Sequence, residues 1–248
     1  MHPQSSHAVP PSGGPLDAAE IDDLVAANRI LADQGILDGY GHVSIRHSGA
    51  PDRYFLSRSR APAIVTAADI MEFDLDSSPV DQQGRLMYIE RFIHGEIYKA
   101  RPDVRAIVHS HSPTVIPFGV SSVRLRAICH MSAFIGHDVP VFEMRDCAGM
   151  SDLLIRNGDH GLGLAKVLGG ASVALMRGHG NVCVGPDLMT AVYRAVYTEV
   201  NARLQAQALA LGGEVTFLAQ EECDLITGRS DTHYHRPWAM WKSRVAPP

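Results

Sequence analysis

Two histidines follow directly on an apolar run near the middle of the chain. The run Ala106-Ile107-Val108 continues into His109-Ser110-His111. In an extended strand, residues i and i+2 point to the same face, so both imidazoles lie on one side. Burying two imidazoles costs free energy unless something binds them, and neutral imidazole nitrogen is a ligand for divalent metal ions. The pattern therefore predicts a buried strand that carries part of a metal site.

A third histidine occurs in a comparable setting further along the chain. Arg177-Gly178-His179-Gly180 follows the apolar segment 171–176. Glycine on both sides lets the backbone turn sharply and present a single side chain. An isolated His-x-His is weak evidence in a chain with 13 histidines. The second, glycine-framed histidine after another strand favours a metal site. Three histidines with open positions are typical of a catalytic site rather than a closed structural one.

Composition limits the remaining possibilities. The chain has 248 residues, of which 46% are hydrophobic and 20% charged, which is typical of a soluble globular protein with one large or two small domains. The net charge of −5 argues against nucleic-acid binding, and no apolar run is long enough to span a bilayer. The four cysteines show no CxxC spacing and suit reduced thiols, so we expect a cytoplasmic location: Cys129, Cys147, Cys183 and Cys223.

Hydrophobic periodicity predicts alternating helices and strands. Residues 1–15 are polar and rich in Pro, Ser and Gly, and we expect a disordered arm there. Residues 16–220 form the expected domain, and 221–248 an irregular C-terminal tail. The predicted helices span 16–34, 88–100, 161–168 and 186–211. The predicted strands span 43–46, 54–56, 71–75, 106–111, 139–144, 171–176 and 182–184.

Glu90 lies in the first turn of the predicted helix 88–100, which leads into the His109 strand. A short connection between helix and strand would bring this carboxylate to the metal. A carboxylate beside a metal in a dry pocket can serve as an acid/base group. Alternatively, Glu90 is only a helix N-terminal acid favoured by the helix dipole. His94, one turn later, is expected to pack or to support the ligands rather than bind the metal.

The chain resembles the class II aldolase/adducin family over about residues 16–220. The matching segments are Gly41-His42-Val43-Ser44-Ile45-Arg46, Glu90 with Tyr98 and Arg101-Pro102-Asp103-Val104, His109-Ser110-His111-Ser112-Pro113, and Gly178-His179-Gly180 before Val184-Gly185. The resemblance implies an α/β three-layer α/β/α fold with a mainly antiparallel central sheet. It also implies one divalent ion (Zn, Mn, Fe or Co) per subunit on His109, His111 and His179, with Glu90 as acid/base or as an additional metal neighbour. The resemblance further implies a homotetramer, or a multiple of it, with active sites between the subunits. Residues 221–248 would then contact a neighbouring subunit.

Departures from the family pattern bear on the substrate. His42 stands where sugar-phosphate members have Asn, and 86–90 lacks the hydroxyl pair that helps to hold phosphate. The pattern resembles the decarboxylase branch, which acts on hydroxylated aromatic or pyridine dicarboxylates. His130 stands near the position of a catalytic Tyr in fuculose-phosphate aldolase, although it could instead be a packing residue. The candidate substrate-binding residues are His42, Ser44, Arg58, Tyr234 and Arg236.

For Tyr234 and Arg236, which lie in the C-terminal tail, the alternative is that the tail only packs on the next subunit.

We expect a metal-dependent carbon–carbon lyase that decarboxylates a hydroxylated aromatic or pyridine (di)carboxylate through a metal-stabilised enolate. Glu90 or His130 would manage the proton. One alternative is an aldolase or epimerase acting on a hydroxy-carbonyl compound or sugar phosphate. A remote alternative is a non-catalytic adducin-like interaction module, against which the three histidines argue. The expected partners are a small carboxylated substrate and further copies of the chain, with no nucleic acid or membrane.

Overall fold

A single mixed sheet runs through the computed structural model, which describes residues 9–228 and 234–245. The strand order is β3-β2-β1-β4-β7-β6-β5, and every neighbouring pair is antiparallel except the parallel β5–β6 pair. This confirms the predicted, mainly antiparallel sheet. The strands are β1 (His42–Arg46), β2 (Arg53–Ser57), β3 (Ile70–Asp74), β4 (Ala106–Ser110), β5 (Val141–Phe142), β6 (Val173–Met176) and β7 (Gly180–Gly185).

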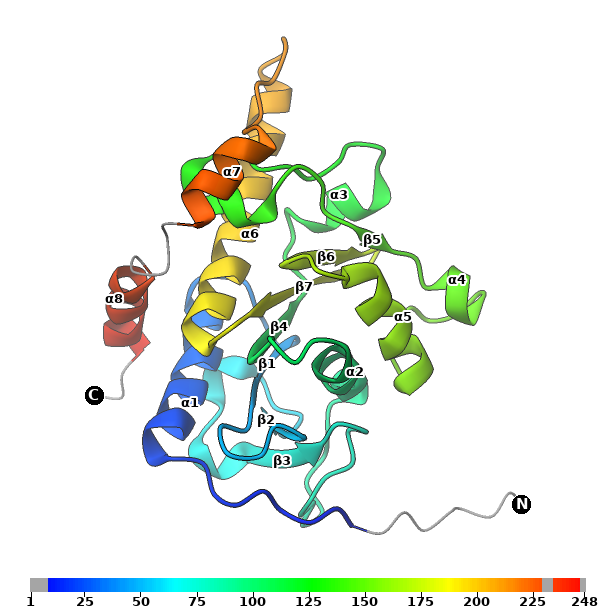
Figure 1. Ribbon diagram of the computed structural model, residues 1–248, viewed down its shortest axis with the longest axis vertical. Coiled ribbons are helices and arrows are strands. Elements are labelled where there is room, and N and C mark those ends of the chain that lie inside the picture. Colours follow the sequence, from blue (N-terminus) through cyan, green and yellow to red (C-terminus); the bar gives the residue numbers. More distant parts are fainter. Residues whose placement is uncertain (1–8, 229–233, 246–248) are drawn as a thin grey trace.

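Helices cover both faces of the sheet (Figure 1). The α-helices are α1 (Ala18–Asp33), α2 (Phe92–Ala100), α3 (Ile116–Val120), α4 (Arg145–Ala148), α5 (Gly158–Leu168), α6 (Leu188–Ala210), α7 (Gln220–Thr227) and α8 (His235–Val245). The short 3-10 helices are η1 (Pro62–Ile64), η2 (Ala67–Asp69), η3 (Ile89–Arg91) and η4 (His130–Ile135). Within the described residues, no helix is both long and apolar enough to cross a membrane.

The alternation of side chains along β4 separates two hydrophobic cores. Ala106 and Val108 pack into the core formed with α1, α6 and α8. Ile107 points to the opposite face, into the core formed with α2 and α5. Figure 1 shows these two groups of helices on either side of the sheet. The structure therefore has the predicted three layers, and His109, two residues after Ile107, faces the α2–α5 layer.

The chain ends differ from the sequence-based expectations. The tail is not irregular, because α7 and α8 form within it, and Trp238 and Trp241 of α8 are buried against the α1–α6 layer. Near the N-terminus, Ser12 Oγ and Gly13 N each donate a hydrogen bond to the carboxylate of Glu72, and both donor–acceptor distances are 2.6 Å. The disorder expected for 1–15 therefore does not extend to these residues, while 1–8 lie outside the described residues.

Some predicted strands are shorter in the structure. The segment 139–144 was predicted as a strand, but only Val141–Phe142 pairs with a neighbour. Pro140 precedes this pair, and α4 begins at Arg145. A proline removes a ladder donor and the helix start removes room for further pairing, so this edge strand stays short.

Gly161 sets the distance between α2 and α5, the helices over the His109 face. A Cβ at this position would lie 2.5 Å from the Phe92 carbonyl oxygen and 2.8 Å from Glu96 Cγ. By contrast, a Cβ at Gly170 would meet nothing within 4 Å.

We expect Gly161→Ala to lower the free energy of unfolding by about 1–3 kcal/mol, the usual cost of overpacking, despite alanine's higher helix propensity. Gly170→Ala is the matched control and should change it by less than about 1 kcal/mol. Urea denaturation followed by circular dichroism measures both, and equal stabilities for the two variants would contradict the close packing.

Candidate metal centre

Four side chains converge on the α2–α5 face of the sheet. One ligand atom from each of Glu90, His109, His111 and His179 lies within 4.8 Å of all the others. Glu90 belongs to η3, His109 to the end of β4, and His111 to the segment that follows β4. His179 occupies the turn between β6 and β7. The structure thus brings together the four residues that the sequence singled out.

Local backbone features place two of these side chains. The turn that carries His179 needs glycine on both sides, because Gly178 has φ +67° and a Cβ on Gly180 would lie 2.1 Å from the Ser110 carbonyl oxygen. Glu90 has non-helical dihedral angles, φ −88° and ψ 17°, which offset η3 from the α2 axis. Its Oε1 accepts a 3.0 Å hydrogen bond from the Ile155 amide, so one carboxylate oxygen is anchored.

The outer ring nitrogens of two histidines face backbone carbonyls. His109 Nδ1 lies 3.1 Å from the Asn181 carbonyl oxygen, and His179 Nδ1 lies 3.0 Å from that of Leu153. A carbonyl only accepts, so each Nδ1 carries the hydrogen and each Nε2 keeps its lone pair. This is the arrangement in which protein carbonyls orient metal-binding histidines.

The inner atoms have the spacing of ligands around a single ion. His179 Nε2 lies 3.1 Å from His111 Nε2, and Glu90 Oε2 lies 3.4 Å from His179 Nε2 and 3.5 Å from His109 Nε2. Ligands about 2.0–2.1 Å from one ion are separated by about 3.0–3.5 Å. His109 Nε2 is buried without any hydrogen-bond partner, which is costly for a polar atom. The residues therefore fit a divalent ion, and three nitrogens with one carboxylate oxygen suit several first-row metals.

The same proximity shifts the pKa values of the cluster. Burial opposes ionisation of Glu90, but the adjacent imidazoles of His109 and His179 outweigh it and hold the pKa of Glu90 well below its usual range. Burial also opposes the charged form of His179, but Glu90 outweighs it and raises the pKa of His179. Burial and its neighbouring histidines lower the pKa of His111 to about 4. In the metal-free cluster, Glu90 therefore favours its ionised form and His179 favours its protonated form.

His42 lies next to the metal ligands. It pairs with His109 across β1 and β4, and the two rings are 5.1 Å apart between centroids. Gly41 permits this approach, because it has φ +82° and a Cβ there would lie 2.9 Å from the His109 carbonyl oxygen. His42 Nδ1 is 2.6 Å from His94 Nε2, which ties it to the buried side of the site.

The other two predicted substrate contacts in this half of the chain have protein partners. Ser44 is fully buried and hydrogen-bonded to His94 and Tyr98, so its predicted part in substrate binding stays a prediction and would act through these partners. Arg58 Nε donates a 2.5 Å hydrogen bond to Asp69 Oδ1, and the Arg58 side chain is about one-third exposed. Its role in binding a substrate stays a prediction.

His130, Tyr234 and Arg236 do not join the cluster within one chain. Tyr234 packs on Tyr193 of α6, with ring centroids 4.1 Å apart, in the core on the opposite face of the sheet. His130 is exposed and lines a cavity of about 100 Å³ together with Tyr193 and Tyr234. Arg236 is exposed on α8, and tail residues 231–233 lie outside the described residues. A contribution of these three side chains to a metal site would have to come through a second subunit.

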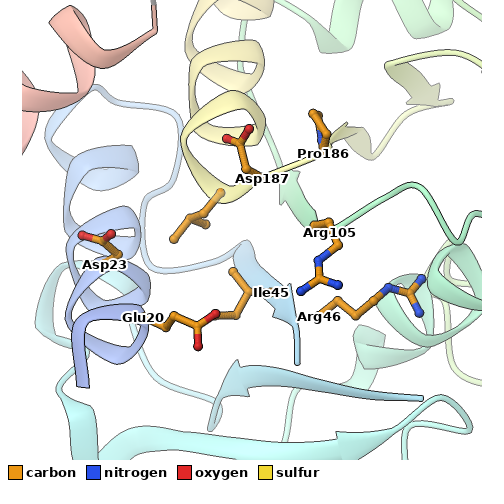
Figure 2. Close-up of a pocket in the computed structure, with 8 residues that line it drawn as sticks. Glu20, Asp23, Ile45, Arg46, Arg105, Pro186 and Asp187 are labelled. Carbon is orange, nitrogen blue, oxygen red and sulfur yellow. The ribbon is translucent and has the colours of Figure 1, made fainter. Parts of the chain in front are cut away.

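A separate cavity of about 190 Å³ lies between α1, β1 and the start of α6 (Figure 2). Arg105 lines it and immediately precedes β4, so the cavity sits at the other end of this strand from His109. The Arg46 guanidinium points away from Glu20 and Asp23 in Figure 2 and donates instead to backbone carbonyls, including that of Val104. This cavity contains none of the cluster residues and is not the candidate site.

We expect metal affinity to rise with pH through the raised pKa of His179, because His179 must lose its proton before Nε2 can bind an ion. Glu90→Gln removes the charge that raises this pKa, so in the metal-free protein the pKa of His179 should fall. Titration of ¹⁵N-labelled histidine by NMR, between about pH 5 and pH 8, measures the shift. An unchanged His179 pKa in Glu90→Gln would show that the two groups are not coupled.

Comparison with known proteins connects this geometry to a family. The family described as Class II Aldolase and Adducin N-terminal domain matches residues 22–206. The chain is 36% identical over 245 residues to the protein named Decarboxylase tropJ of Talaromyces stipitatus, covering 90% of this chain and 92% of that protein. It is 30% identical over 224 residues to a 3,4-dihydroxyphthalate decarboxylase of Arthrobacter keyseri, covering 84% and 86% of the two chains.

Solved structures agree on the fold. L-fuculose 1-phosphate aldolase from Glaciozyma antarctica superposes with a TM-score of 0.74 at 21% identity, covering 94% of this chain and 93% of that chain. An aldolase II superfamily protein from Pseudomonas syringae has a TM-score of 0.77, also at 21% identity, and covers 94% of both chains. The family predicted from the sequence motifs is therefore confirmed, and the chain belongs to the class II aldolase/adducin family.

Proposed function

We propose that this chain is a metal-dependent lyase that decarboxylates a hydroxylated aromatic or pyridine (di)carboxylate. The observation that carries the proposal is the cluster of Glu90, His109, His111 and His179, in which backbone carbonyls orient the rings of His109 and His179 so that Nε2 faces inward. Relatives named as decarboxylases, aligned over most of both chains, support the choice of reaction. The ion is one Zn, Mn, Fe or Co per subunit.

Decarboxylation breaks the bond between a ring carbon and a carboxylate carbon. Carbon dioxide leaves, the electron pair remains on the ring, and a proton takes the place of the lost group. When bound, a divalent ion supplies a Lewis acid for the substrate oxygen next to the reacting carbon. His109, His111 and His179 would hold the ion, and Glu90, anchored through Oε1, would face it with Oε2.

Glu90 is the group that moves the proton in this proposal. Its depressed pKa keeps it ionised at neutral pH, so it begins as a proton acceptor. Glu90 takes the hydrogen of the substrate hydroxyl and returns it to the ring carbon, so the product forms as its phenolate and takes one proton from solvent. His130 is exposed on the opposite side of the sheet and would take part only through a neighbouring subunit.

The substrate contacts divide into two groups. His42 lies beside the ligands of its own chain, and Arg58 lies just beyond the end of β2. Tyr234 and Arg236 lie in the α8 region on the opposite layer, so we assign them to the site of an adjacent subunit in a homo-oligomer, a tetramer or a multiple of it. An arginine there would pair with the carboxylate that is retained.

The metal-loaded protein should release carbon dioxide from members of a panel of hydroxylated aromatic and pyridine dicarboxylates, including 3,4-dihydroxyphthalate. Coupled detection of carbon dioxide measures this, and L-fuculose 1-phosphate is the comparison substrate. Cleavage of the sugar phosphate without carbon dioxide from any acid would make the chain an aldolase. A metal-loaded protein inert toward every compound would favour an adducin-like interaction module.

Glu90→Gln should reduce turnover by about 10²-fold or more, the usual scale for losing a general acid/base, while the metal content stays measurable. Glu96→Gln is the matched control, because Glu96 is similarly buried on the adjoining helix but pairs with Lys99. Steady-state kinetics measure the turnover of both variants, and elemental analysis measures their metal content. Near-normal turnover of Glu90→Gln would give Glu90 a structural role and move the proton transfer to His130.

A further inference from the structure

A chain of hydrogen bonds runs inward from the side of the metal cluster. His42 Nδ1 lies 2.6 Å from His94 Nε2, and His94 Nδ1 lies 2.6 Å from Ser44 Oγ. Ser44 Oγ lies 2.8 Å from the hydroxyl of Tyr98. All four side chains are at most 2% exposed. The chain therefore connects four groups in sequence through the dry interior between β1 and α2.

The hydrogen atoms in this chain can be counted. His42 and His94 are at most 2% exposed and neither ring is hydrogen-bonded to a carboxylate among the described residues, so burial keeps both neutral and each imidazole carries a single N–H. Ser44 and Tyr98 contribute one hydroxyl hydrogen each. Four hydrogens are thus available for three links, and one hydrogen is left over in any arrangement.

The position of the spare hydrogen distinguishes the arrangements. If His42 donates from Nδ1 and the chain runs inward, the spare hydrogen sits on Tyr98, whose hydroxyl has Ser44 as its only hydrogen-bond partner among the described residues. If His94 and Tyr98 both donate to Ser44, the Ser44 hydroxyl hydrogen is the spare one. Both arrangements leave a donor unpaired in the dry interior, which is strongly unfavourable.

The opposite direction moves the unpaired donor out of the interior, to the end of the chain of hydrogen bonds beside the metal cluster. Tyr98 donates to Ser44, Ser44 donates to His94 Nδ1, and His94 Nε2–H donates to His42 Nδ1. The spare hydrogen then lies on His42 Nε2, which points away from His94 because the two imidazole nitrogens diverge. His42 also contacts the His109 ring and the Tyr88 ring, with centroids 5.1 Å and 4.5 Å away.

We propose that Tyr98, Ser44 and His94 form a relay that fixes His42 as an Nε2–H donor directed at an anionic oxygen of the bound substrate. The identity of that ligand as a hydroxylated aromatic carboxylate rests on the proposed function. The direction of the relay follows from the hydrogen-bond geometry and does not rest on the proposed function. An Nε2 that carries hydrogen has no lone pair for an ion, so His42 is a substrate-binding donor and not a fourth metal-binding nitrogen. His94, Ser44 and Tyr98 are positioning residues.

The first test reads the tautomers directly in metal-free, ¹⁵N-histidine-labelled protein. Two-bond hydrogen–nitrogen correlation spectra should show His42 and His94 protonated at Nε2, with unprotonated, hydrogen-bonded Nδ1. His42→Gln identifies the His42 signals by their loss. Protonation of His42 at Nδ1 would overturn the proposal, whether or not the protein decarboxylates anything.

A variant pair tests the relay itself. Ser44→Ala removes the only hydrogen-bond partner that His94 Nδ1 has in the described part of the chain, so the His42 nitrogen shifts should move toward the average of the two tautomers. Ser132→Ala is the matched control, since Ser132 is also fully buried but donates to the Tyr197 carbonyl on the opposite layer. His42 shifts that are the same in wild type and Ser44→Ala would show that the relay does not set the tautomer.

Kinetics test what the donor binds, with 3,4-dihydroxyphthalate as the probe. His42→Gln offers an amide oxygen to His94 and an amide N–H to the substrate, so KM should stay within about tenfold of wild type. His42→Leu lacks both and should raise KM about 10–100-fold, the scale for losing a hydrogen bond to a charged group, with the metal content unchanged. A wild-type KM in His42→Leu would overturn the contact with substrate. If the wild type releases no carbon dioxide, the proposed function fails, while the NMR result still decides the relay.

Discussion

The close approach of imidazole lone pairs is the constraint on which the site depends. His111 Nε2 and His179 Nε2 are 3.1 Å apart, and His109 Nε2 is buried beside them without a hydrogen-bond partner. Two nitrogen lone pairs repel at such distances unless a proton or a metal ion lies between them. The backbone carbonyls of Asn181 and Leu153 prevent two of the rings from turning their N–H groups inward. The fold therefore maintains an arrangement that favours a proton or a metal ion at its centre.

The sheet topology explains how distant segments supply this arrangement. β4 is central in the sheet and carries His109, while its neighbours β1 and β7 supply His42 and the Asn181 carbonyl. The β6–β7 turn adds His179, and η3 adds Glu90 above the strand end. Every candidate metal ligand but Glu90 thus comes from or adjoins β4 and its neighbouring hairpin, which antiparallel pairing holds in fixed register.

Part of this site could be predicted from the sequence because it depends on short-range patterns. Alternation along a strand placed His109 and His111, and the two glycines around His179 marked a turn. The Leu153 carbonyl and the Ile155 amide could not be found in this way, because any residue supplies these groups and only the path of the loop after α4 brings them close. The strand register that joins His42 to His109 is likewise a long-range property.

The C-terminal expectations depended on composition and resemblance, and they were less successful. A segment rich in His, Arg and Trp was expected to be irregular, but the two tryptophans of α8 form an apolar stripe that packs on the α1–α6 layer. Tyr234 and Arg236 consequently lie across the sheet from the cluster of their own chain. Sequence patterns predict which face of an element is apolar, but not on which layer a terminal helix packs.

Metal content per chain tests the central claim most directly. Elemental analysis of the wild type after loading with Zn²⁺ or Mn²⁺ and gel filtration should give one divalent ion per chain. The triple variant His109→Ala, His111→Ala, His179→Ala should retain none while keeping its circular dichroism spectrum. Stoichiometric metal in the triple variant, or a wild type that retains no metal, would contradict the account.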